Sequence, residues 1–359
     1  MKSLFRNSIY SVVKTLMTLL FPLVSYVYAA RIFLADGMGQ VDFSKSIANF
    51  FVLMASSGIA NYATREAAKL RDDRKKLSKL THELLIINLI TSLFSYGLFL
   101  AVVFSVDKLF DYKLLLFINS ITIFLNVIGM EWLYIAVEEF RYIAIRTAII
   151  QLGCMVAMFI SVRTKTDLWK YVAIQVIASS GNSLCNAFNV NKYISLKWIG
   201  GYEIKRHIRP LLAIFASWLF VQLFTHLDTV MLGFMTNDGV VGLYTAGQKI
   251  STMIATVITA ASMALSPRIS YYAEKHEIEK ITELVSDAIK LILFLGIPAF
   301  FGLQGISKET LLLFSGKAFL QADLNTKIMA SRIVLVPLNS MLVLHLFIPM
   351  RMEKNNIIS

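Results

Sequence analysis

The chain has 359 residues, of which 57% are hydrophobic and only 16% are charged, and its mean hydropathy is +0.65. A water-soluble domain of this length needs far more charged surface, so the composition excludes an ordinary soluble protein. The formal net charge is +12, which would suggest nucleic acid as a partner if the chain were soluble.

Ten long apolar stretches follow one another with short polar gaps between them. A helix needs about 20 mostly apolar residues to cross the roughly 30 Å hydrocarbon core of a bilayer. The runs are continuous and do not alternate apolar with polar residues, which favours helices over barrel strands. We therefore predict an all-α polytopic membrane protein with about ten transmembrane helices. In chain order the predicted spans are 8–30, 41–62, 82–106, 112–137, 141–162, 167–190, 209–235, 239–264, 284–305 and 328–349.

Lys and Arg collect in every second gap between these spans. If the N-terminus is cytoplasmic, the cytoplasmic segments hold 21 of the 35 basic residues and the opposite gaps hold nine. This bias follows the positive-inside rule, so the net charge is mostly a signal of topology and nucleic acid is not expected. The most basic segment, 63–80, is amphipathic and is expected to lie along the cytoplasmic headgroups.

Signatures of enzymes are missing from the sequence. It contains no Gly-rich phosphate loop, no His-Glu-x-x-His and no G-x-S-x-G. The five histidines are too scattered for an evident metal site. We expect neither catalysis nor a cofactor or metal, and substrate handling then falls to polar groups within the bundle.

Basic residues inside the spans are the first candidates. A cation at the bilayer centre costs about 2.5–3.5 kcal/mol, so each must reach the headgroups or face a hydrated interior. Lys249 is about ten residues into its span, too deep to reach the headgroups easily, and is the best candidate for an inward cation. For Lys45 the sequence leaves both orientations open, towards the interior or towards the headgroups. Arg332 lies near a span end, so its side chain could extend to the headgroups. Arg31, at the outer end of the first span, would line the mouth of the cavity or anchor at the headgroups.

Two of the acidic residues within predicted spans are further candidates. Asp228 lies deep in 209–235, two residues after His226, and Glu131 lies in 112–137. An intramembrane carboxylate of this kind binds a proton or a cation, pairs with a basic residue in the lumen, or ties helices together. We treat Asp228 and Glu131 as coupling or structural acids.

An internal repeat suggests how the spans are organised. A shift of 203 residues lays 8–30 over 211–233 and 82–106 over 285–309. Many transporters consist of two related halves, and spans seven to ten would match only the first four of six. We expect either a C-terminally shortened product of a twelve-helix ancestor or a genuine ten-helix protein. The repeat divides the chain into an N-terminal lobe of six helices (1–190), a cytoplasmic linker (191–208) and a C-terminal lobe of four helices (209–359). The identities under this shift are Gly39 with Gly242, Ile47 with Ile250 and Arg65 with Arg268.

Several strings together resemble one family. They are GMEWLYIAVEEFRYI at 129–143, DTVMLG at 228–233, VGLYTAGQKI at 241–250, SPR at 266–268 and YATRE at 62–66. As a set they resemble the Wzx-type O-antigen flippases of polysaccharide biosynthesis, within the MATE-like multidrug/oligosaccharidyl-lipid/polysaccharide exporter superfamily. The resemblance covers essentially the whole chain.

The resemblance implies a fold and a substrate. The fold would have two six-helix lobes around a central cavity, of which the second lobe would be incomplete here. The substrate would be an oligosaccharide repeat unit on undecaprenyl pyrophosphate, flipped across the bacterial inner membrane in lipopolysaccharide biosynthesis. A polysaccharide polymerase and a chain-length regulator would be partners. The alternatives are a MATE-type drug or cation exporter, a membrane polysaccharide polymerase, and a non-functional truncated remnant.

Overall fold

The structure is a computed structural model that describes residues 2–56, 58–263, 268–269, 271–272, 275 and 277–342. Within these ranges every regular element is a helix, which confirms the predicted all-α class. The chain forms two compact units, Met1–Val241 and Gly242–Ser359, which we call the N-terminal unit and the C-terminal unit. The predicted lobes on either side of a linker at 191–208 remain a prediction.

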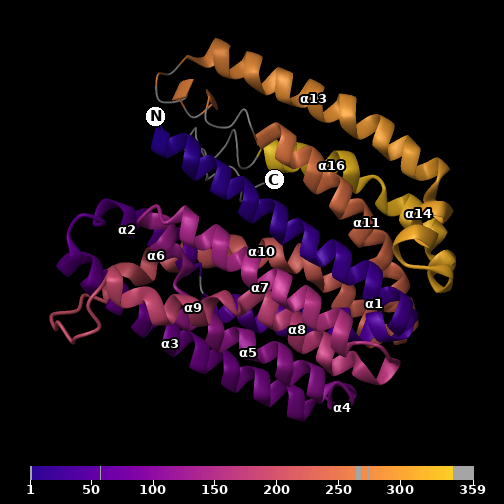
Figure 1. Cartoon of the computed structure of the whole chain (residues 1–359), viewed down its shortest axis with the longest axis horizontal. Coiled ribbons are helices and arrows are strands. Elements are labelled where there is room, and N and C mark those ends of the chain that lie inside the picture. Colours follow the sequence, from indigo (N-terminus) through magenta and orange to yellow (C-terminus); the bar gives the residue numbers. More distant parts are fainter. Residues whose placement is uncertain are drawn as a thin grey trace. The chain divides into compact units, whose positions relative to one another are not determined.

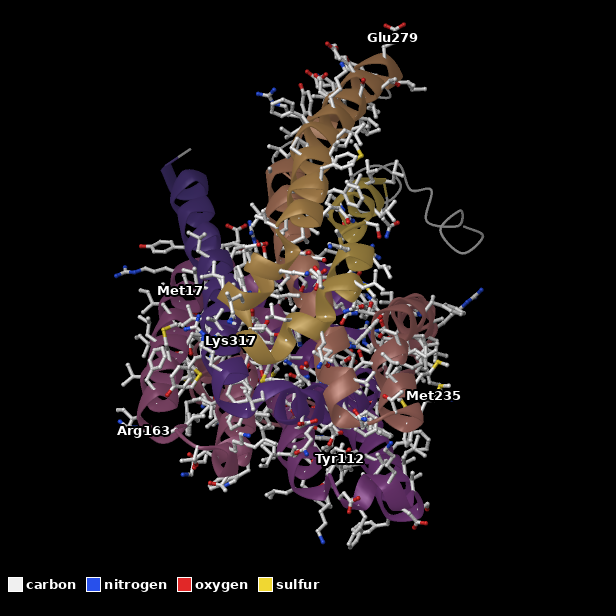
Figure 2. The ribbon with its side chains drawn as sticks, turned by 90° about the vertical axis from the view of Figure 1, so that its right-hand side faces the viewer. Met17, Tyr112, Arg163, Met235, Glu279 and Lys317 are labelled. Carbon is white, nitrogen blue, oxygen red and sulfur yellow. The ribbon has the colours of Figure 1, made fainter. Side chains whose placement is uncertain are left out.

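Helix α1 is the scaffold of the N-terminal unit, because it packs against α3, α5, α7 and α10. Helices α2 and α6 lie at one end of the unit and α4 lies at the other (Figure 1). Figure 2 looks towards the end that carries α4 and labels Tyr112, Arg163 and Met235 there. The helices are α1 (Lys2–Ser56), α2 (Ile59–Lys69), α3 (Arg74–Ser105), α4 (Asp107–Phe110), α5 (Lys113–Gly129), α6 (Glu131–Ala136), α7 (Phe140–Ser161), α8 (Leu168–Ser180), α9 (Asn182–Asn189) and α10 (Lys205–Met235), with short 3-10 turns η1 (Lys165–Asp167) and η2 (Val190–Lys192).

Helix α1 consists of two arms that meet at Leu34. The backbone of Leu34 is not helical, with φ 58° and ψ −166°, and the chain changes direction there. The predicted spans 8–30 and 41–62 correspond to these two arms. The sequence gives no sign of this break, because a branched apolar residue such as Leu34 rarely adopts a positive φ.

Two further breaks divide spans that we predicted to be continuous. The second span was predicted to run to residue 62, but α1 ends at Ser56 and α2 begins at Ile59, with Gly58 left-handed at φ 72°. That prediction was wrong at its C-terminal end, because a left-handed glycine ends a helix. A second left-handed residue, Met130 at φ 40°, separates α5 from α6.

Helix α3 shows that the unit is polar inside and apolar outside. Its buried face includes Asn88, Ser92 and Ser95, whereas the exposed face carries large apolar side chains such as Leu93 and Phe94. Exposed apolar residues are costly in water but suit a hydrocarbon environment. The same pattern leaves room for polar cavities between the helices.

The C-terminal unit contains the rest of α11 (Asp238–Met263), which starts in the N-terminal unit, and four later helices. Helix α13 packs against α16, and the Asn325 side chain donates to the carbonyl oxygens of Leu243 at 3.2 Å and Tyr244 at 2.9 Å. Residues 264 and 343–349 of the predicted spans lie outside the described residues. The later helices are α13 (Ile278–Gly305), α14 (Ser307–Phe314), α15 (Asp323–Met329) and α16 (Arg332–Ser340), with the 3-10 turn η3 (Lys317–Ala322).

In the described residues, five helices are long and apolar enough to cross a membrane, or six if the bent helix α10 counts as one span. One of the five, Lys14–Lys69, joins the two arms of α1. The predicted number of about ten is therefore not confirmed. Predicted span 167–190 is divided into α8 and α9, of 13 and 8 residues, which are individually too short to span.

Candidate functional site

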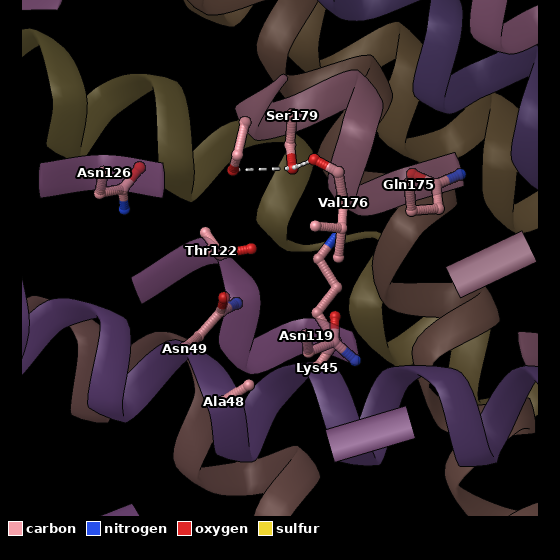
Figure 3. Close-up of a pocket in the computed structure, with 10 residues that line it drawn as sticks. Lys45, Ala48, Asn49, Asn119, Thr122, Asn126, Gln175, Val176 and Ser179 are labelled. Atoms are coloured by element: carbon pink, nitrogen blue, oxygen red, sulfur yellow. Dashed lines mark hydrogen bonds between the residues drawn. The ribbon is translucent and has the colours of Figure 1, made fainter. Parts of the chain in front are cut away.

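Two adjoining polar cavities lie inside the N-terminal unit. The first, which we call the Lys45 cavity, has a volume of about 250 Å³ and lies between α1, α5 and α8. In Figure 3 the side chains of Asn49, Thr122 and Asn126 point into it, and Lys45 extends from α1 towards Val176 of α8. Its lining residues are Lys45, Ala48, Asn49, Asn119, Thr122, Asn126, Gln175, Val176, Ser179 and Ser180.

The second, the Glu131 cavity, has a volume of about 230 Å³. Asn126 and Ser179 line both cavities, so the two share a wall. The Glu131 cavity is lined by Ser56, Ile59, Ala60, Asn88, Asn126, Gly129, Met130, Glu131, Trp132, Ser179, Asn182 and Ser183.

Helical spacing explains why these polar residues meet. Asn119, Thr122 and Asn126 are three and seven residues apart on α5, and Gln175 and Ser179 are four apart on α8. Residues at such intervals lie on one face of a helix. The sequence prediction did not include the amides of α5 and α8. Their spacing was the available signal.

Glu131 lies between two cations. Its Oε1 is 2.5 Å from Lys14 Nζ, and its Oε2 is 3.0 Å from Arg146 Nη2. The Arg146 side chain is only 5% exposed and its guanidinium faces the ring of Tyr142 at 5.3 Å. Arg146 lies within α7, where the Glu131 carboxylate offsets the cost of burying its charge.

Two amide oxygens in the wall of the Glu131 cavity are buried without a partner. Asn88 and Asn182 are 7% and 8% exposed, and no group of the described chain hydrogen-bonds to Oδ1 of either. Native structures rarely leave buried polar atoms in this state, because each costs about 1–3 kcal/mol. The cavity therefore suits a ligand or water that donates hydrogen bonds.

Asp228 lies on α10 near a sharp bend. The two arms of this helix, Lys205–Phe220 and Thr225–Met235, differ in direction by 53°. Asp228 Oδ1 accepts a hydrogen bond from the Thr229 backbone at 2.6 Å. The structure places two of the predicted site residues, Lys45 and Glu131, in adjoining cavities.

The other predicted site residues lie elsewhere. Arg31 is exposed on the first arm of α1 and lines neither cavity. Lys249 on α11 and Arg332 at the start of α16 belong to the C-terminal unit. The roles predicted for all six residues stay predictions. In the part of the chain that the structure describes, no three His, Cys, Asp or Glu side chains form a group able to hold a metal ion.

Comparison with known proteins gives consistent matches. A protein of Escherichia coli strain K12 that carries the name O-antigen transporter is 22% identical over 308 residues, which cover 82% of this chain and 74% of that protein. A relative from Haloferax volcanii, named as a low-salt glycan biosynthesis flippase, is 26% identical over 148 residues, 41% of this chain and 27% of its own.

A solved structure shares the fold. It is a MATE-family multidrug resistance transporter of the MOP superfamily in an inward-facing conformation. The TM-score is 0.65 at 13% identity, and the match covers 95% of this chain and 83% of that one. The predicted MATE-like fold is therefore supported.

With these transporter matches and its apolar helices, the chain is an integral membrane protein, not an enzyme. The family described as polysaccharide biosynthesis protein matches residues 4–273, well over half of the sequence. The chain belongs to the polysaccharide biosynthesis protein family.

Proposed function

We propose that this protein flips lipid-linked polysaccharide repeat units from the cytoplasmic to the periplasmic leaflet of a bacterial inner membrane. The observation that carries the proposal is the pair of adjoining polar cavities inside a helix bundle whose outer surface is apolar. Family membership and the names of the relatives support the same class of cargo.

The physical reason is the cost of desolvation. A pyrophosphate and several sugars cannot pass through hydrocarbon, because each polar group would lose its hydration without replacement. A polar interior supplies replacement hydrogen bonds, while the polyprenyl tail stays in the surrounding lipid. Rocking of one part of the transporter against another would expose the headgroup first to one side of the membrane and then to the other.

The basic residues would balance the charge of the pyrophosphate. Lys45 is the strongest candidate, since it lines a cavity beside uncharged polar groups. Lys249, Arg31 and Arg332 are assigned the same task on the sequence argument. Asp228 is proposed as the acid that couples transport to an ion gradient. The N-terminus is proposed to be cytoplasmic, and a polymerase and a chain-length regulator are proposed to act beside the flippase.

Deletion in the native host tests the function. Surface polysaccharide and lipid-linked intermediates are measured in the deletion strain, with and without residues 1–359 supplied in trans. We expect loss of surface repeat units, intermediates retained on the cytoplasmic side, and restoration by the added chain. Single repeat units on the surface of the deletion strain would instead identify a polymerase, and normal export without the chain would reject the flippase.

The role of Lys45 has its own test. Lys45→Gln removes the charge, so export of the repeat unit should fall at least tenfold, whereas Lys45→Arg keeps the charge and should retain most activity. Equal activity in the two variants would remove Lys45 from the substrate site. Normal transport by Asp228→Asn would likewise end the coupling role of that carboxylate.

A further inference from the structure

Two residues that line the Glu131 cavity carry buried amide oxygens that have no hydrogen-bond partner in the described chain. Asn88 Oδ1 and Asn182 Oδ1 come from α3 and α9, are both buried, and line the same cavity. Ser56, Asn126, Ser179 and Ser183 add hydroxyl and amide groups to the wall. Amides and hydroxyls can both donate and accept, so the wall as a whole is matched to a ligand that also does both.

A metal cation is a poor occupant. Among the described residues that line the cavity, Glu131 alone carries a carboxylate, and it already pairs with Lys14 and Arg146. One negative and two positive charges leave the surroundings of the cavity net positive, so a further cation would be repelled.

A phosphate group is disfavoured for a different reason. The net positive surroundings attract a phosphate, but a fully ionised phosphate carries acceptors only, and the orphaned groups of Asn88 and Asn182 are acceptors too. Acceptor facing acceptor leaves both without a hydrogen bond. Lys45, which would suit a phosphate, lies in the other cavity.

We propose that the Glu131 cavity binds one sugar ring of the lipid-linked unit, through hydroxyl groups that donate to Asn88 and Asn182. The inference rests on the proposed flippase function and names the part of the substrate that this cavity takes. The cavity volume of about 230 Å³ equals roughly seven or eight water molecules. That room holds one ring with its hydroxyls and excludes a whole oligosaccharide.

Trp132 provides the readout, because its buried side chain lines the cavity. The chain has four tryptophans, and the other three, Trp169, Trp198 and Trp218, are exposed and can be changed to Phe. The full chain with Trp132 alone is placed in lipid nanodiscs. It is titrated with the free oligosaccharide released from the host's surface polysaccharide by mild acid, and in parallel with sodium chloride and with inorganic pyrophosphate.

We expect a saturable change of Trp132 fluorescence with the oligosaccharide and none with either salt. Asn88→Ala combined with Asn182→Ala should weaken the oligosaccharide affinity at least tenfold, because two hydroxyl donors lose their acceptors. Asn61→Ala is the matched control, since Asn61 is exposed on α2 and lines neither cavity. If the double variant does not fold, Ser179→Ala replaces it, because Ser179 is exposed yet lines both cavities.

Three results would overturn the sugar site: saturation by sodium, saturation by pyrophosphate, or an unchanged oligosaccharide affinity in the folded Asn88/Asn182 variant. The export assay separates this failure from failure of the proposed function. If the deletion strain loses export and the double variant restores it at the wild-type rate, the flippase proposal is supported and the sugar site is rejected. If the deletion strain exports normally, the flippase proposal is rejected, regardless of the result of the Trp132 fluorescence titration.

Discussion

At the end of the N-terminal unit that carries α2, the buried Glu83 carboxylate of α3 holds the start of α10. At the end that carries α4, hydrogen bonds from Lys108 hold the end of α10, and one from Tyr112 holds the start of α11. Both ends join residues more than a hundred positions apart in sequence. The two sets of contacts differ in burial, and burial decides how much each contact contributes to the free energy of unfolding.

At the α2 end, the Glu83 side chain is fully buried and serves as the common acceptor. It lies 2.7 Å from Arg206 Nη2, 2.9 Å from His207 Nε2 and 2.7 Å from the backbone N of Glu203. The Tyr62 hydroxyl lies 2.8 Å from His207 Nδ1 and extends the network to α2. A buried carboxylate with three donors is fully satisfied, and removing its charge leaves the donors unmatched.

At the α4 end, the contacts are fewer and more accessible. The Tyr112 hydroxyl donates to Asp238 Oδ1 at 2.5 Å. Lys108 Nζ donates to the carbonyl oxygens of Phe234 at 3.3 Å and Thr236 at 3.0 Å. Each contact is separate, so the loss of one leaves the others in place. At the start of α10 the contacts share one acceptor, so they are lost together. At its end the contacts are separate, so they are lost one at a time.

The largest effect is expected from Glu83→Gln at the α2 end. The variant leaves Arg206 and His207 without their charged acceptor, and the free energy of unfolding should fall by about 3–5 kcal/mol. Thermal or denaturant unfolding of the purified protein in detergent measures it. Glu138→Gln is the control, because Glu138 pairs with Arg71 at the surface and its side chain is 52% exposed, so its loss should cost no more than about 1 kcal/mol. Equal losses in the two variants would contradict a buried cluster.

An intermediate effect is expected from Tyr112→Phe at the α4 end. The variant keeps the ring and removes the hydrogen bond to Asp238, so the free energy of unfolding should fall by about 1.5 kcal/mol. Burial first, and then the hydrogen bond to Asp238, raise the pKa of the Tyr112 phenol. A raised pKa contributes stability that is complete below the ordinary value of about 10 and is lost as the pH rises above it. The wild-type protein should therefore lose stability above pH 10 more steeply than the variant, and parallel curves would refute this assignment.

The smallest effect is expected from Glu203→Gln, which removes a surface ion pair beside the buried cluster. Lys79 Nζ lies 3.0 Å from Glu203 Oε1, and this hydrogen bond holds the pKa of the Glu203 carboxyl below its ordinary range. Its contribution is therefore present above the ordinary carboxyl pKa and disappears as the pH falls below it. The melting temperature should fall slightly at neutral pH, and the difference should vanish in molar salt because the pair is exposed. A large drop that persists in salt would mean that Glu203 belongs to the buried cluster.

Much of the fold could be predicted from the sequence, because long apolar runs indicate membrane-spanning helices. The predicted spans 82–106, 141–162 and 284–305 correspond to α3, α7 and α13 with ends shifted by a few residues. The breaks between helices were harder to predict from the sequence. Gly58 carries a chemical signal for a left-handed backbone, but Leu34 and Met130 adopt a positive φ without such a signal in the sequence.

The candidate site was predicted only in part, because charge is conspicuous in an apolar sequence and amides are not. The sequence identified Lys45 and Glu131, which the structure places in adjoining cavities. It could not identify Asn88 or Asn182, since whether a single amide faces a cavity depends on the rotation of its helix. The pairing of Arg146 with Glu131 could not be predicted, because the two residues are 15 positions apart and only tertiary structure brings them together.

The bend in α10 sets a length for the unit. Two arms of 16 and 11 residues inclined by 53° span about 4 Å less from end to end than the same residues in one straight helix, at 1.5 Å per residue. Glu83 contacts the start of this bent helix and Lys108 contacts its end, at the carbonyl oxygen of Phe234. Straightening α10 would therefore break one of these two contacts, and the exposed hydrogen bond of Lys108 is the weaker of them.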